Sequence, residues 1–358
     1  MKESEQAVES KRGEIAFRRK LFQQQVEGER VFEDEYSAAD ILEIMRERMG
    51  KTRRQVEALI AQDVGISPYI ELGAERGQRA LVLENDFDAR GFALDLSYES
   101  LRSAAYLAER FGLEKQPVCV CCDAYNLPFR NNAIPFAFCY NTLHHFPDPA
   151  PIVAELYRVM APGAFFFDEE PFKQLLRIVL YKRKPPRTIE ARRRRGVLTK
   201  VVETLFSEMA PGEVAYGIIE NEDITPAAWR RILDVFDKAE ATLESPGDFV
   251  RSSLYSSGFS PRYLATKLLG GNILGLCKKT VGQALALESA WDALGCPNCR
   301  VTGERGEEDR APLHRADAGL RCTNCGCEFP ARDGVLFLFT AAEMEKLYPE
   351  LLGGQSEA

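Results

Sequence analysis

The sequence has no run of about 18 apolar residues, the length that marks a candidate transmembrane helix. Its first residues, MKESEQAVESKRGE, are charged and lack the apolar core of an export signal. We therefore expect neither a membrane span nor export, and we expect a cytoplasmic protein. Internal repeats and low-complexity tracts are also missing.

The sequence also has no excess of basic residues. The 358 residues include 46 Lys and Arg against 54 Asp and Glu, which gives a formal net charge of −8. This balance argues against a surface built as a whole to bind nucleic acid, although it allows a local basic patch. The apolar fraction of 45% supplies a substantial core, and the length suits one large α/β domain plus a smaller module.

Ten cysteines occur without a secretion signal, so a disulfide framework is not expected. Five lie in apolar, strand-like runs, where a free cysteine behaves as a small hydrophobe, and we expect them in the core. These are Cys119, Cys121, Cys122, Cys139 and Cys277. The other five all follow residue 295, and their clustering indicates a separate module.

Four of these late cysteines form two C-x-x-C knuckles that are separated by 22 residues. The knuckles are Cys296 with Cys299 and Cys322 with Cys325. Two such pairs supply four thiolates for tetrahedral Zn²⁺, and a small module with little core gains folding free energy from the metal. We therefore predict a structural zinc site. Cys327 and His314 are spare ligands, and a redox or disulfide arrangement does not fit a cytoplasmic chain.

The order of apolar patterns predicts the domain organisation. Residues 1–62 have apolar side chains at helical intervals, which predicts helices that either pack on the following domain or cover a ligand as a lid. Residues 63–280 alternate short apolar runs with helical stretches and contain a charged, helical insertion at 172–246. We expect a linker helix at 281–294 and a zinc-ribbon domain with a C-terminal helix at 295–358.

The alternating region predicts a doubly wound, Rossmann-like α/β fold with a mostly parallel, seven-stranded sheet. The strand candidates are PYIELG at 68–73, GFALDLS at 91–97, PVCVCCDA at 117–124, IPFAFCYNTL at 134–143 and GAFFFDEEP at 163–171. Helix candidates lie between them at 98–112 and 149–160. Beyond the insertion we expect a helix at 249–258 and a closing strand at 272–279. A ligand should bind outside the carboxyl ends of the strands.

The turn after the first strand candidate begins at Glu71 and includes Gly73 and Gly77. A glycine-rich turn lets the backbone approach a ligand closely, and Asp95 at the end of the second strand can bind ribose hydroxyls. The dinucleotide pattern G-x-G-x-x-G is missing, and carboxylates recur at Glu71, Asp95 and Asp123. They would repel a pyrophosphate and attract a sulfonium and an ammonium. The charges therefore favour S-adenosylmethionine.

Five stretches in the usual order resemble the S-adenosylmethionine-dependent methyltransferase superfamily, in the branch of the ubiquinone and menaquinone biosynthesis methyltransferases. They are Y-I-E-L-G-A-E-R-G, F-A-L-D-L-S, C-D-A-Y-N-L-P-F, N-T-L-H-H-F-P-D-P and E-L-Y-R-V-M-A-P-G, across residues 69–164. The resemblance implies that Glu71 and Gly73 lie near the methionine moiety and that Asp95 binds the ribose hydroxyls. It also implies that Asp123 and Ala124 read the adenine edge and that Asn141 and the next two residues line the pocket floor.

Three positions depart from the superfamily pattern. Glu75 replaces the central glycine of the first motif, and Ala137 replaces the aspartate that often begins the fourth strand. Only Gly163 remains of the usual glycine pair after the proline. These departures bear on the exact contacts rather than on the cofactor class.

A sulfonium is an activated methyl donor, so the enzyme must align a nucleophile and, where needed, accept its proton. His144 and His145, two of only three histidines, follow the fourth strand candidate, and an imidazole suits proton removal near neutral pH. Glu169 and Glu170, with Asp168, are the rival carboxylate bases. The alternatives are histidines that cap a strand end or pack beside the cofactor, and carboxylates that form a solvated strand end.

A basic run at 182–195 stands out in this acidic sequence. It is either a solvated helix face or an anion site for a phosphate-bearing substrate or RNA. The expected function is methyl transfer to a small-molecule or lipid-like acceptor. The alternatives are an RNA methyltransferase, acting on tRNA or rRNA through 182–195, and a non-catalytic cofactor-binding scaffold. We infer no obligate protein partner.

Residues 295–340 resemble the small zinc-ribbon activator subunit of tRNA and protein methyltransferases. The resemblance rests on the knuckles and on C-G-C-E-F-P-A-R-D-G-V-L-F-L-F, in which Leu336 stands where that family usually has proline. In the family the ribbon packs on a partner methyltransferase and stabilises it. This chain therefore looks like a covalent version of that pair.

Overall fold

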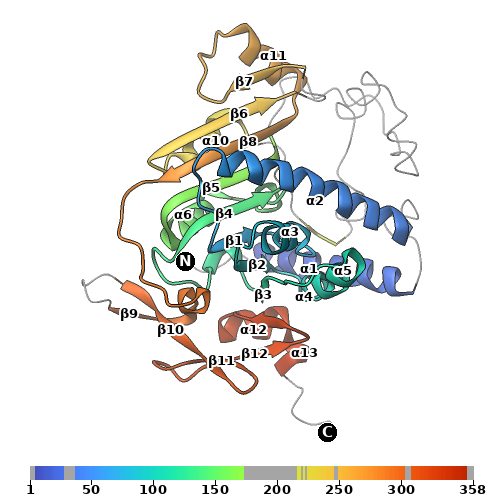
Figure 1. Ribbon diagram of the computed structural model, residues 1–358, viewed down its shortest axis with the longest axis vertical. Coiled ribbons are helices and arrows are strands. Elements are labelled where there is room, and N and C mark those ends of the chain that lie inside the picture. Colours follow the sequence, from blue (N-terminus) through green and yellow to red (C-terminus); the bar gives the residue numbers. More distant parts are fainter. Residues whose placement is uncertain are drawn as a thin grey trace.

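The computed structural model describes residues 5–27, 37–172, 216–218, 221, 224–245, 249–302 and 308–352 (Figure 1). The basic run at 182–195 lies outside the described residues, as does most of the predicted insertion at 172–246. None of the described helices combines the length and the apolar character that crossing a bilayer would require.

Two long helices precede the sheet, α1 (Glu5–Val26) and α2 (Ala38–Ile60). A capping box starts α2, because the Ser37 side chain accepts a hydrogen bond from the Asp40 amide and the Asp40 carboxylate accepts one from the Ser37 amide. Buried residues recur at helical intervals along α2, from Ile41 to Leu59. The predicted helical character of this region is confirmed.

The core of the molecule is a sheet in which five parallel strands lie in the order β3-β2-β1-β4-β5. Their bounds are β1 Tyr69–Leu72, β2 Gly91–Asp95, β3 Val118–Cys121, β4 Ile134–Tyr140 and β5 Met160–Pro171. The connecting helices are α3 (Gln78–Asp86), α4 (Tyr98–Leu101), α5 (Ser103–Phe111) and α6 (Ala150–Val159), with short 3₁₀ turns η1 (Ala124–Asn126) and η2 (Leu143–His145). Strand order reverses between β1 and β4, so ligands are expected at that crevice.

Alternating strand residues form two apolar layers, one on each face of the sheet. In β1, Ile70 and Leu72 belong to the cluster that includes α6, whereas Tyr69 belongs to the cluster that includes α2 and α3. All three side chains are nearly inaccessible to solvent. Because both faces are buried, these strands are almost entirely apolar, as parallel strands generally are. The doubly wound α/β fold is confirmed.

The sheet is completed on the β5 side by antiparallel strands. β8 (Asn272–Lys279) pairs with β5, β6 (Lys238–Glu244) pairs with β8, and the short β7 (Arg251–Ser253) pairs with β6. Helix α10 (Pro226–Leu233) packs on this part of the sheet, and α11 (Pro261–Leu269) follows β7. The closing strand at 272–279 was predicted correctly.

Two sequence predictions in this region differ from the structure. The described part of the predicted helical insertion at 172–246 contains helix α10 but also strand β6, in which Ala241 and Leu243 are buried between more exposed polar neighbours. The predicted helix at 249–258 contains strand β7, in which Ser252 is buried between two exposed residues, and the next residue, Leu254, is buried as well. In both segments the side chains alternate with period two, a strand pattern that the charges and serines obscure.

The C-terminal ribbon extends the same sheet. Its strands are β9 (Gly295–Thr302), β10 (Glu308–Ala316), β11 (Gly319–Cys322), β12 (Glu328–Arg332) and β13 (Val335–Phe337), followed by α12 (Ala341–Leu347) and α13 (Pro349–Leu352). Strand β13 pairs in parallel with β3, so the ribbon forms one edge of a 13-stranded sheet whose other edge is β7 (Figure 1).

The predicted linker helix at 281–294 is wrong over most of its length. Residues 281–289 contain no helix, and only the 3₁₀ turn η4 (Ala290–Ala293) is helical. Gly282 has a φ of +101°, and the Leu285 amide donates to the Asn132 carbonyl oxygen at 2.7 Å. The linker is therefore held against the sheet domain by backbone bonds that a continuous helix would use internally.

Candidate cofactor site

The turn after β1 has three residues with positive φ, Gly73, Glu75 and Gly77. Gly73 must be glycine, because a Cβ there would lie 2.4 Å from the Thr142 Oγ1 atom. Glu75, at the position where the superfamily has glycine, adopts a φ of +52° that is unfavourable for a side chain with a Cβ. The turn therefore keeps its left-handed backbone although one glycine is replaced.

Glu71 lies at the base of this turn and is 1% exposed. Its Oε2 atom accepts a hydrogen bond of 2.9 Å from the Ala80 amide in α3, while its buried Oε1 atom accepts none from the described residues. Burial raises the pKa of Glu71 to about 8, against the opposing effect of the nearby Arg79 guanidinium. The site thus contains a buried acceptor that lacks a donor.

Asp95 ends β2 beside the same turn. Its carboxylate accepts hydrogen bonds from the Glu75 and Ser97 amides, both at 2.8 Å. Burial raises the pKa of Asp95 to about 6, against the effects of those hydrogen bonds and of the Arg18 guanidinium. The sequence-predicted residues Glu71, Gly73, Gly77 and Asp95 are therefore brought together around one turn.

Asp123 and Ala124 follow β3, and both are buried. The Asp123 carboxylate accepts a hydrogen bond of 3.0 Å from the Tyr125 amide and forms an ion pair of 2.5 Å with the Lys11 ammonium of α1. Burial raises the pKa of Asp123, against the lowering effect of Lys11. Helix α1 therefore contacts the carboxylate that the superfamily resemblance assigns to the adenine edge.

A polar face of α1 covers the strand ends next to Lys11. Arg18 donates to Glu14 at 2.7 Å, and these residues lie on the same side of the helix as Lys11. Burial alone would lower the pKa of Arg18, but the carboxylates of Glu14, Glu75 and Asp95 outweigh it and raise the pKa. Cations of α1 thus face carboxylates of the turn and of β2 and β3.

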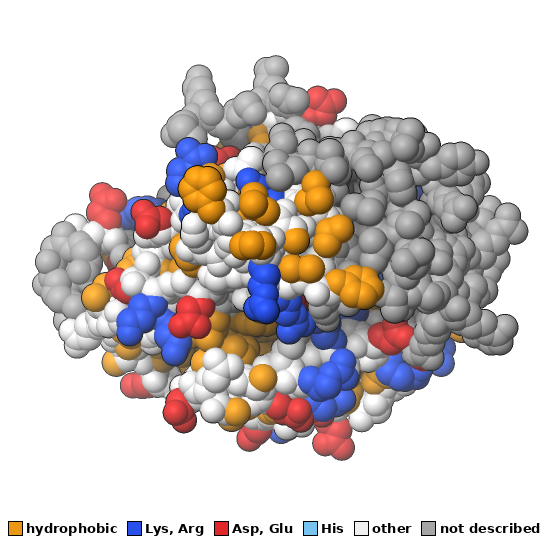
Figure 2. Space-filling model, turned by 90° about the horizontal axis from the view of Figure 1, so that it is seen from above, with side chains coloured by type: hydrophobic (Ala, Val, Ile, Leu, Met, Phe, Trp, Pro, Cys, Tyr) orange, Lys and Arg blue, Asp and Glu red, His pale blue; other side chains and the backbone are white. Residues whose placement is uncertain are grey.

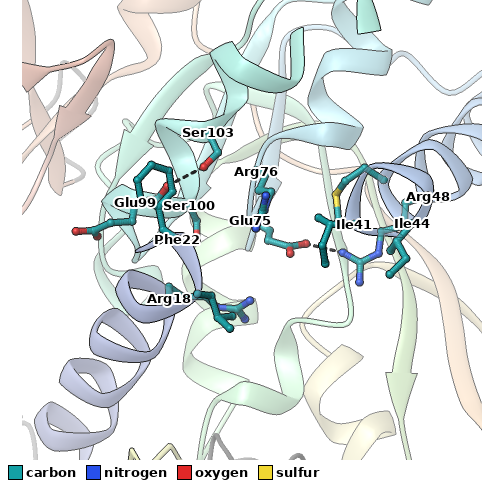
Figure 3. Close-up of a pocket in the computed structure, with 12 residues that line it drawn as sticks. Arg18, Phe22, Ile41, Ile44, Arg48, Glu75, Arg76, Glu99, Ser100 and Ser103 are labelled. Carbon is teal, nitrogen blue, oxygen red and sulfur yellow. Dashed lines mark hydrogen bonds and ion pairs between the residues drawn. The ribbon is translucent and has the colours of Figure 1, made fainter. Parts of the chain in front are cut away.

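A pocket lies between α1, α2 and the turn after β1 (Figure 3). Glu75 enters it and pairs with Arg48 of α2 at 2.6 Å, while Arg18 and Arg76 also line it. Burial would raise the pKa of Glu75, but the surrounding guanidiniums, that of Arg48 foremost, lower it to about 2. Glu75 is therefore ionised and balances the charge of the arginines in this pocket.

The end of β4 carries the candidate histidines. Asn141 has a φ of +52°, is exposed, and its amide donates to the Asp168 carbonyl oxygen at 3.0 Å. The rings of His144 and His145 lie 4.2 Å apart. Burial, with the neighbouring His144, lowers the pKa of His145 to about 4. His145 is therefore neutral at pH 7 and can accept a proton.

The carboxylates at the end of β5 have distinct environments. Glu170 is fully buried and accepts hydrogen bonds from the amides of Thr142, Leu143 and His144 and lies 3.1 Å from the His144 Nδ1 atom. Glu169 pairs with Lys51 at 2.9 Å, and Lys51 also contacts Asp168 at 2.5 Å. Burial would raise the pKa of Glu169, but Lys51 and Arg79 lower it overall. Glu170 therefore anchors the histidine turn.

The four knuckle cysteines converge in the ribbon. Their sulfur atoms all lie within 4.8 Å of one another, with Cys296 3.7 Å from Cys325 and Cys299 3.5 Å from Cys322. Four sulfurs bound at about 2.3 Å to one tetrahedral ion would lie about 3.8 Å apart. The arrangement therefore has the dimensions of a four-thiolate metal site.

Residues 70–167 match the family model described as a methyltransferase domain. This segment therefore resembles a methyltransferase domain. The match begins in β1 and stops within β5, so it spans the ends of β1 to β4 but not Asp168, Glu169 and Glu170 at the end of β5. All the predicted cofactor residues lie within the matched segment.

Three solved structures resemble this chain at low identity. A chain of the complex that contains the Haloferax volcanii Trm112 methyltransferase activator is 14% identical over 66% of this chain and 94% of that chain, with a TM-score of 0.40. A SAM-dependent methyltransferase from Methanosarcina mazei is 19% identical over 62% and 98%, with a TM-score of 0.39. One from Aquifex aeolicus is 13% identical over 61% and 87%, with a TM-score of 0.35.

Sequence reasoning missed the residues that the other elements bring to the methyltransferase domain. Lys11, Arg18, Arg48 and Lys51 come from α1 and α2, whose helical periodicity indicates burial but not the target of a charged side chain. Arg310 of the ribbon was also missed, although it is 1% exposed. The only sequence signal for Arg310 is that it directly precedes the apolar residues A-P-L at 311–313.

Proposed function

We propose that this chain is an S-adenosylmethionine-dependent methyltransferase that acts on a small-molecule or lipid-like acceptor. The observation that supports it most is the set of buried or half-buried carboxylates at the ends of β1, β2 and β3 beside the tight turn, inside the segment that matches a methyltransferase domain. These carboxylates suit a cationic ligand with an ammonium, a sulfonium and a ribose.

The residues present fit this cofactor. The buried Oε1 atom of Glu71 lacks a donor that an ammonium would supply, and Gly73 lets the adjacent turn keep its positive φ. Asp95 would accept from ribose hydroxyls, and Asp123 and Ala124 would face the adenine edge. When bound, the sulfonium of the cofactor supplies an activated methyl group to the acceptor.

The chain's own residues would orient the acceptor and hold its proton. Glu170 fixes the turn that carries His144 and His145 through hydrogen bonds to three successive amides. His145 is neutral at pH 7 and is the candidate for accepting a proton from the acceptor, but burial makes it a weaker base than a free imidazole. Glu169 is a weaker candidate because its carboxylate is already paired with Lys51.

Binding of S-adenosylmethionine, measured by calorimetry, tests the cofactor assignment. We expect Asp95→Asn to weaken binding strongly, because a neutral amide cannot accept two hydroxyl bonds as well as two amide bonds. Asp317→Asn, at an exposed turn of the ribbon, is the matched control and should bind as the wild type does. Equal affinities for all three proteins would remove Asp95 from the site.

Transfer of radiolabel from the cofactor to a fractionated extract tests the acceptor class. Label in small-molecule or lipid fractions supports the proposal, whereas label in RNA favours the alternative that depends on residues 182–195. Binding without transfer to any fraction favours a non-catalytic scaffold. His145→Ala should lower turnover far more than cofactor affinity, while His314→Ala, at an exposed position on β10, should change neither.

We also propose that the knuckle cysteines hold a structural zinc ion, since four thiolates close the coordination shell. Freshly purified protein should contain one equivalent of zinc by elemental analysis. Cys299→Ser should lower the zinc content and the stability of the ribbon, while Cys327→Ser, outside the cluster of four, should retain the metal. Less than about half an equivalent in the wild type would contradict this assignment.

A further inference from the structure

The end of the molecule formed by β7 and α11 exposes a concentration of large apolar side chains. Of the eight large apolar side chains that are exposed among the described residues, five lie within 249–268. We call this group the apolar tip: Phe249, Tyr255, Phe259, Leu264 and Leu268. Phe259 is 92% exposed and Phe249 is 60% exposed. Isolated exposed apolar residues are ordinary, but a cluster of this kind indicates an interaction surface.

The structure of α11 shows why these residues face outward. Tyr263 and Thr266 form the buried side of the helix, and the Thr266 hydroxyl bonds back to the Tyr263 carbonyl oxygen. Leu264 and Leu268, one turn apart, occupy another side and are exposed. The helix is therefore apolar on a side that makes no contribution to the protein core.

Positive charge accompanies the apolar tip. No Asp or Glu occurs from residue 249 to residue 287, although the whole chain has a net charge of −8. Arg251, Arg262 and Lys267 lie among the apolar residues, and Arg251 pairs with Glu244 of β6 at 3.0 Å. Figure 2 looks down on this end of the molecule and shows apolar side chains gathered beside Lys and Arg side chains.

We propose that the apolar tip binds the surface of an anionic phospholipid bilayer. Exposed aromatic and aliphatic side chains can enter the region between headgroups and acyl chains, and flanking Lys and Arg are attracted to anionic headgroups. The rest of this acidic protein is repelled by such a surface, so the tip would also set the orientation of the bound molecule. The absence of Asp and Glu from 249–287 favours an anionic bilayer over a protein partner, because a protein surface usually presents charges of both signs.

The binding site is separate from the methyl-transfer site. The tip lies at the β7 edge of the sheet, and strands β6 and β8 separate this edge from β5, β4 and β1, whose ends carry the proposed site (Figure 1). The proposal therefore stands whether or not the acceptor is lipid-like. If the acceptor is lipid-like, the tip would bring the enzyme to the surface that contains it.

Vesicle flotation tests the proposal with the full-length chain. We expect the wild type to float with vesicles of equal parts phosphatidylcholine and phosphatidylglycerol, and not with pure phosphatidylcholine. The variant Phe249→Ser, Phe259→Ser and Leu264→Ser should lose flotation. A control variant with Ile60→Ser and Tyr106→Ser, which removes exposed apolar side chains elsewhere, should float as the wild type does.

The contribution of charge is tested separately. Arg262→Gln with Lys267→Gln should weaken partition to the mixed vesicles about 25-fold, at roughly fivefold for each cation near an anionic surface. The wild type should also dissociate as salt rises, because surface electrostatics are screened. Equal binding of the wild type to both vesicle compositions would contradict the anionic requirement.

Three further outcomes would overturn the proposal. The arginines at 192–195 could bind anionic vesicles themselves, so a variant with all four replaced by serine is the second control. Flotation that survives the serine variant of the tip but not this control would place binding on the basic run.

Loss of a dimer in the tip variant, measured by light scattering without vesicles, would assign the tip to a second copy of the chain. A lower melting temperature of the tip variant, without any vesicle binding by the wild type, would assign it to an intramolecular contact.

Discussion

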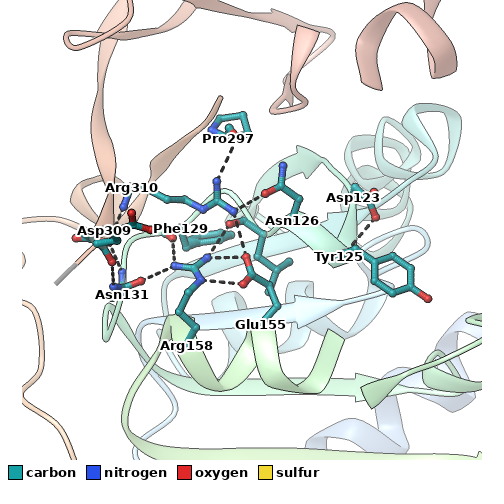
Figure 4. Close-up of polar contacts among 12 residues, drawn as sticks. Asp123, Tyr125, Asn126, Phe129, Asn131, Glu155, Arg158, Pro297, Asp309 and Arg310 are labelled. Atoms are coloured by element: carbon teal, nitrogen blue, oxygen red, sulfur yellow. Dashed lines mark hydrogen bonds and ion pairs between the residues drawn. The ribbon is translucent and has the colours of Figure 1, made fainter. Parts of the chain in front are cut away.

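Arg310 of the ribbon is buried where the ribbon meets the methyltransferase domain, and Arg310→Met is the most informative substitution in the chain. Its guanidinium donates to the Cys296 and Pro297 carbonyl oxygens and to Asn126 Oδ1 and Glu155 Oε1 (Figure 4). Methionine keeps most of the apolar stem but none of these hydrogen bonds. The substitution therefore isolates the polar contribution of a single side chain.

The magnitude follows from what the change leaves behind. Removing one partner of a buried ion pair costs about 3–5 kcal/mol, because the other charge stays buried. Glu155 retains Arg158, which is bonded to its two oxygens at 2.7 and 2.8 Å. The remaining cost arises mainly from the carbonyl oxygens and Asn126, so we expect a loss of about 3 kcal/mol in the free energy of unfolding.

Urea unfolding of the zinc-saturated protein, followed by circular dichroism, measures this loss. Arg321→Met is the matched control, because Arg321 is exposed and lies 4.0 Å from Glu328. It should change the free energy of unfolding by less than about 0.5 kcal/mol. A similarly small effect of Arg310→Met would refute the reasoning that this network joins the ribbon to the sheet domain.

The same substitution tests a link to the cofactor site. Asn126 ends the 3₁₀ turn η1 that starts directly after Asp123, so Arg310 restrains the loop that carries the proposed adenine contacts. We expect Arg310→Met to weaken S-adenosylmethionine binding even under conditions where the variant is folded. An unchanged dissociation constant, together with lower stability, would confine the role of Arg310 to folding.

Two further predictions concern the turn after β1. Gly73→Ala should lower the melting temperature and the cofactor affinity more than Gly112→Ala does. Both positions have a φ near +66°, but only at Gly73 would an added Cβ clash with Thr142. Equal destabilisation by the two substitutions would contradict the steric argument. The folded state raises the pKa of Glu71 from 4.5 to about 8, so Glu71 contributes stability below pH 4.5 that is lost as pH rises toward 8. Glu71→Gln lacks this titration, and its melting temperature relative to the wild type should therefore rise between about pH 5 and pH 8; a constant difference would contradict the shifted pKa.

The parallel strands could be predicted because each is short, apolar and followed by a turn or a helix. Burial on both faces allows almost any apolar side chain, so runs such as FAL in β2 and CVC in β3 mark strands without an alternating pattern. Strands β6 and β7 could not be recognised in the same way. They lie at a sheet edge where polar residues alternate with buried ones, and this pattern resembles a charged helix or a loop when it is read over few residues.

The cofactor carboxylates were identified for a related reason. Glu71, Asp95 and Asp123 each end a strand, and the carboxyl ends of parallel strands must meet at one edge of the sheet. The role of Glu170 was not predictable in this way. Its four hydrogen-bond partners lie more than 25 residues away along the chain, and only the pairing of β4 with β5 brings them together.

The arrangement of α1 and α2 bears on the choice between a packing layer and a lid. Their cations reach across the strand ends, with Lys11 paired to Asp123, Arg48 to Glu75 and Lys51 to Glu169. A layer that only covered the sheet would direct apolar residues at it and leave its cations in solvent. Because the Lys11–Asp123 pair lies at a proposed cofactor carboxylate, a ligand that contacts Asp123 must share it with Lys11 or displace Lys11. We therefore propose that α1 covers the ligand as well as the sheet.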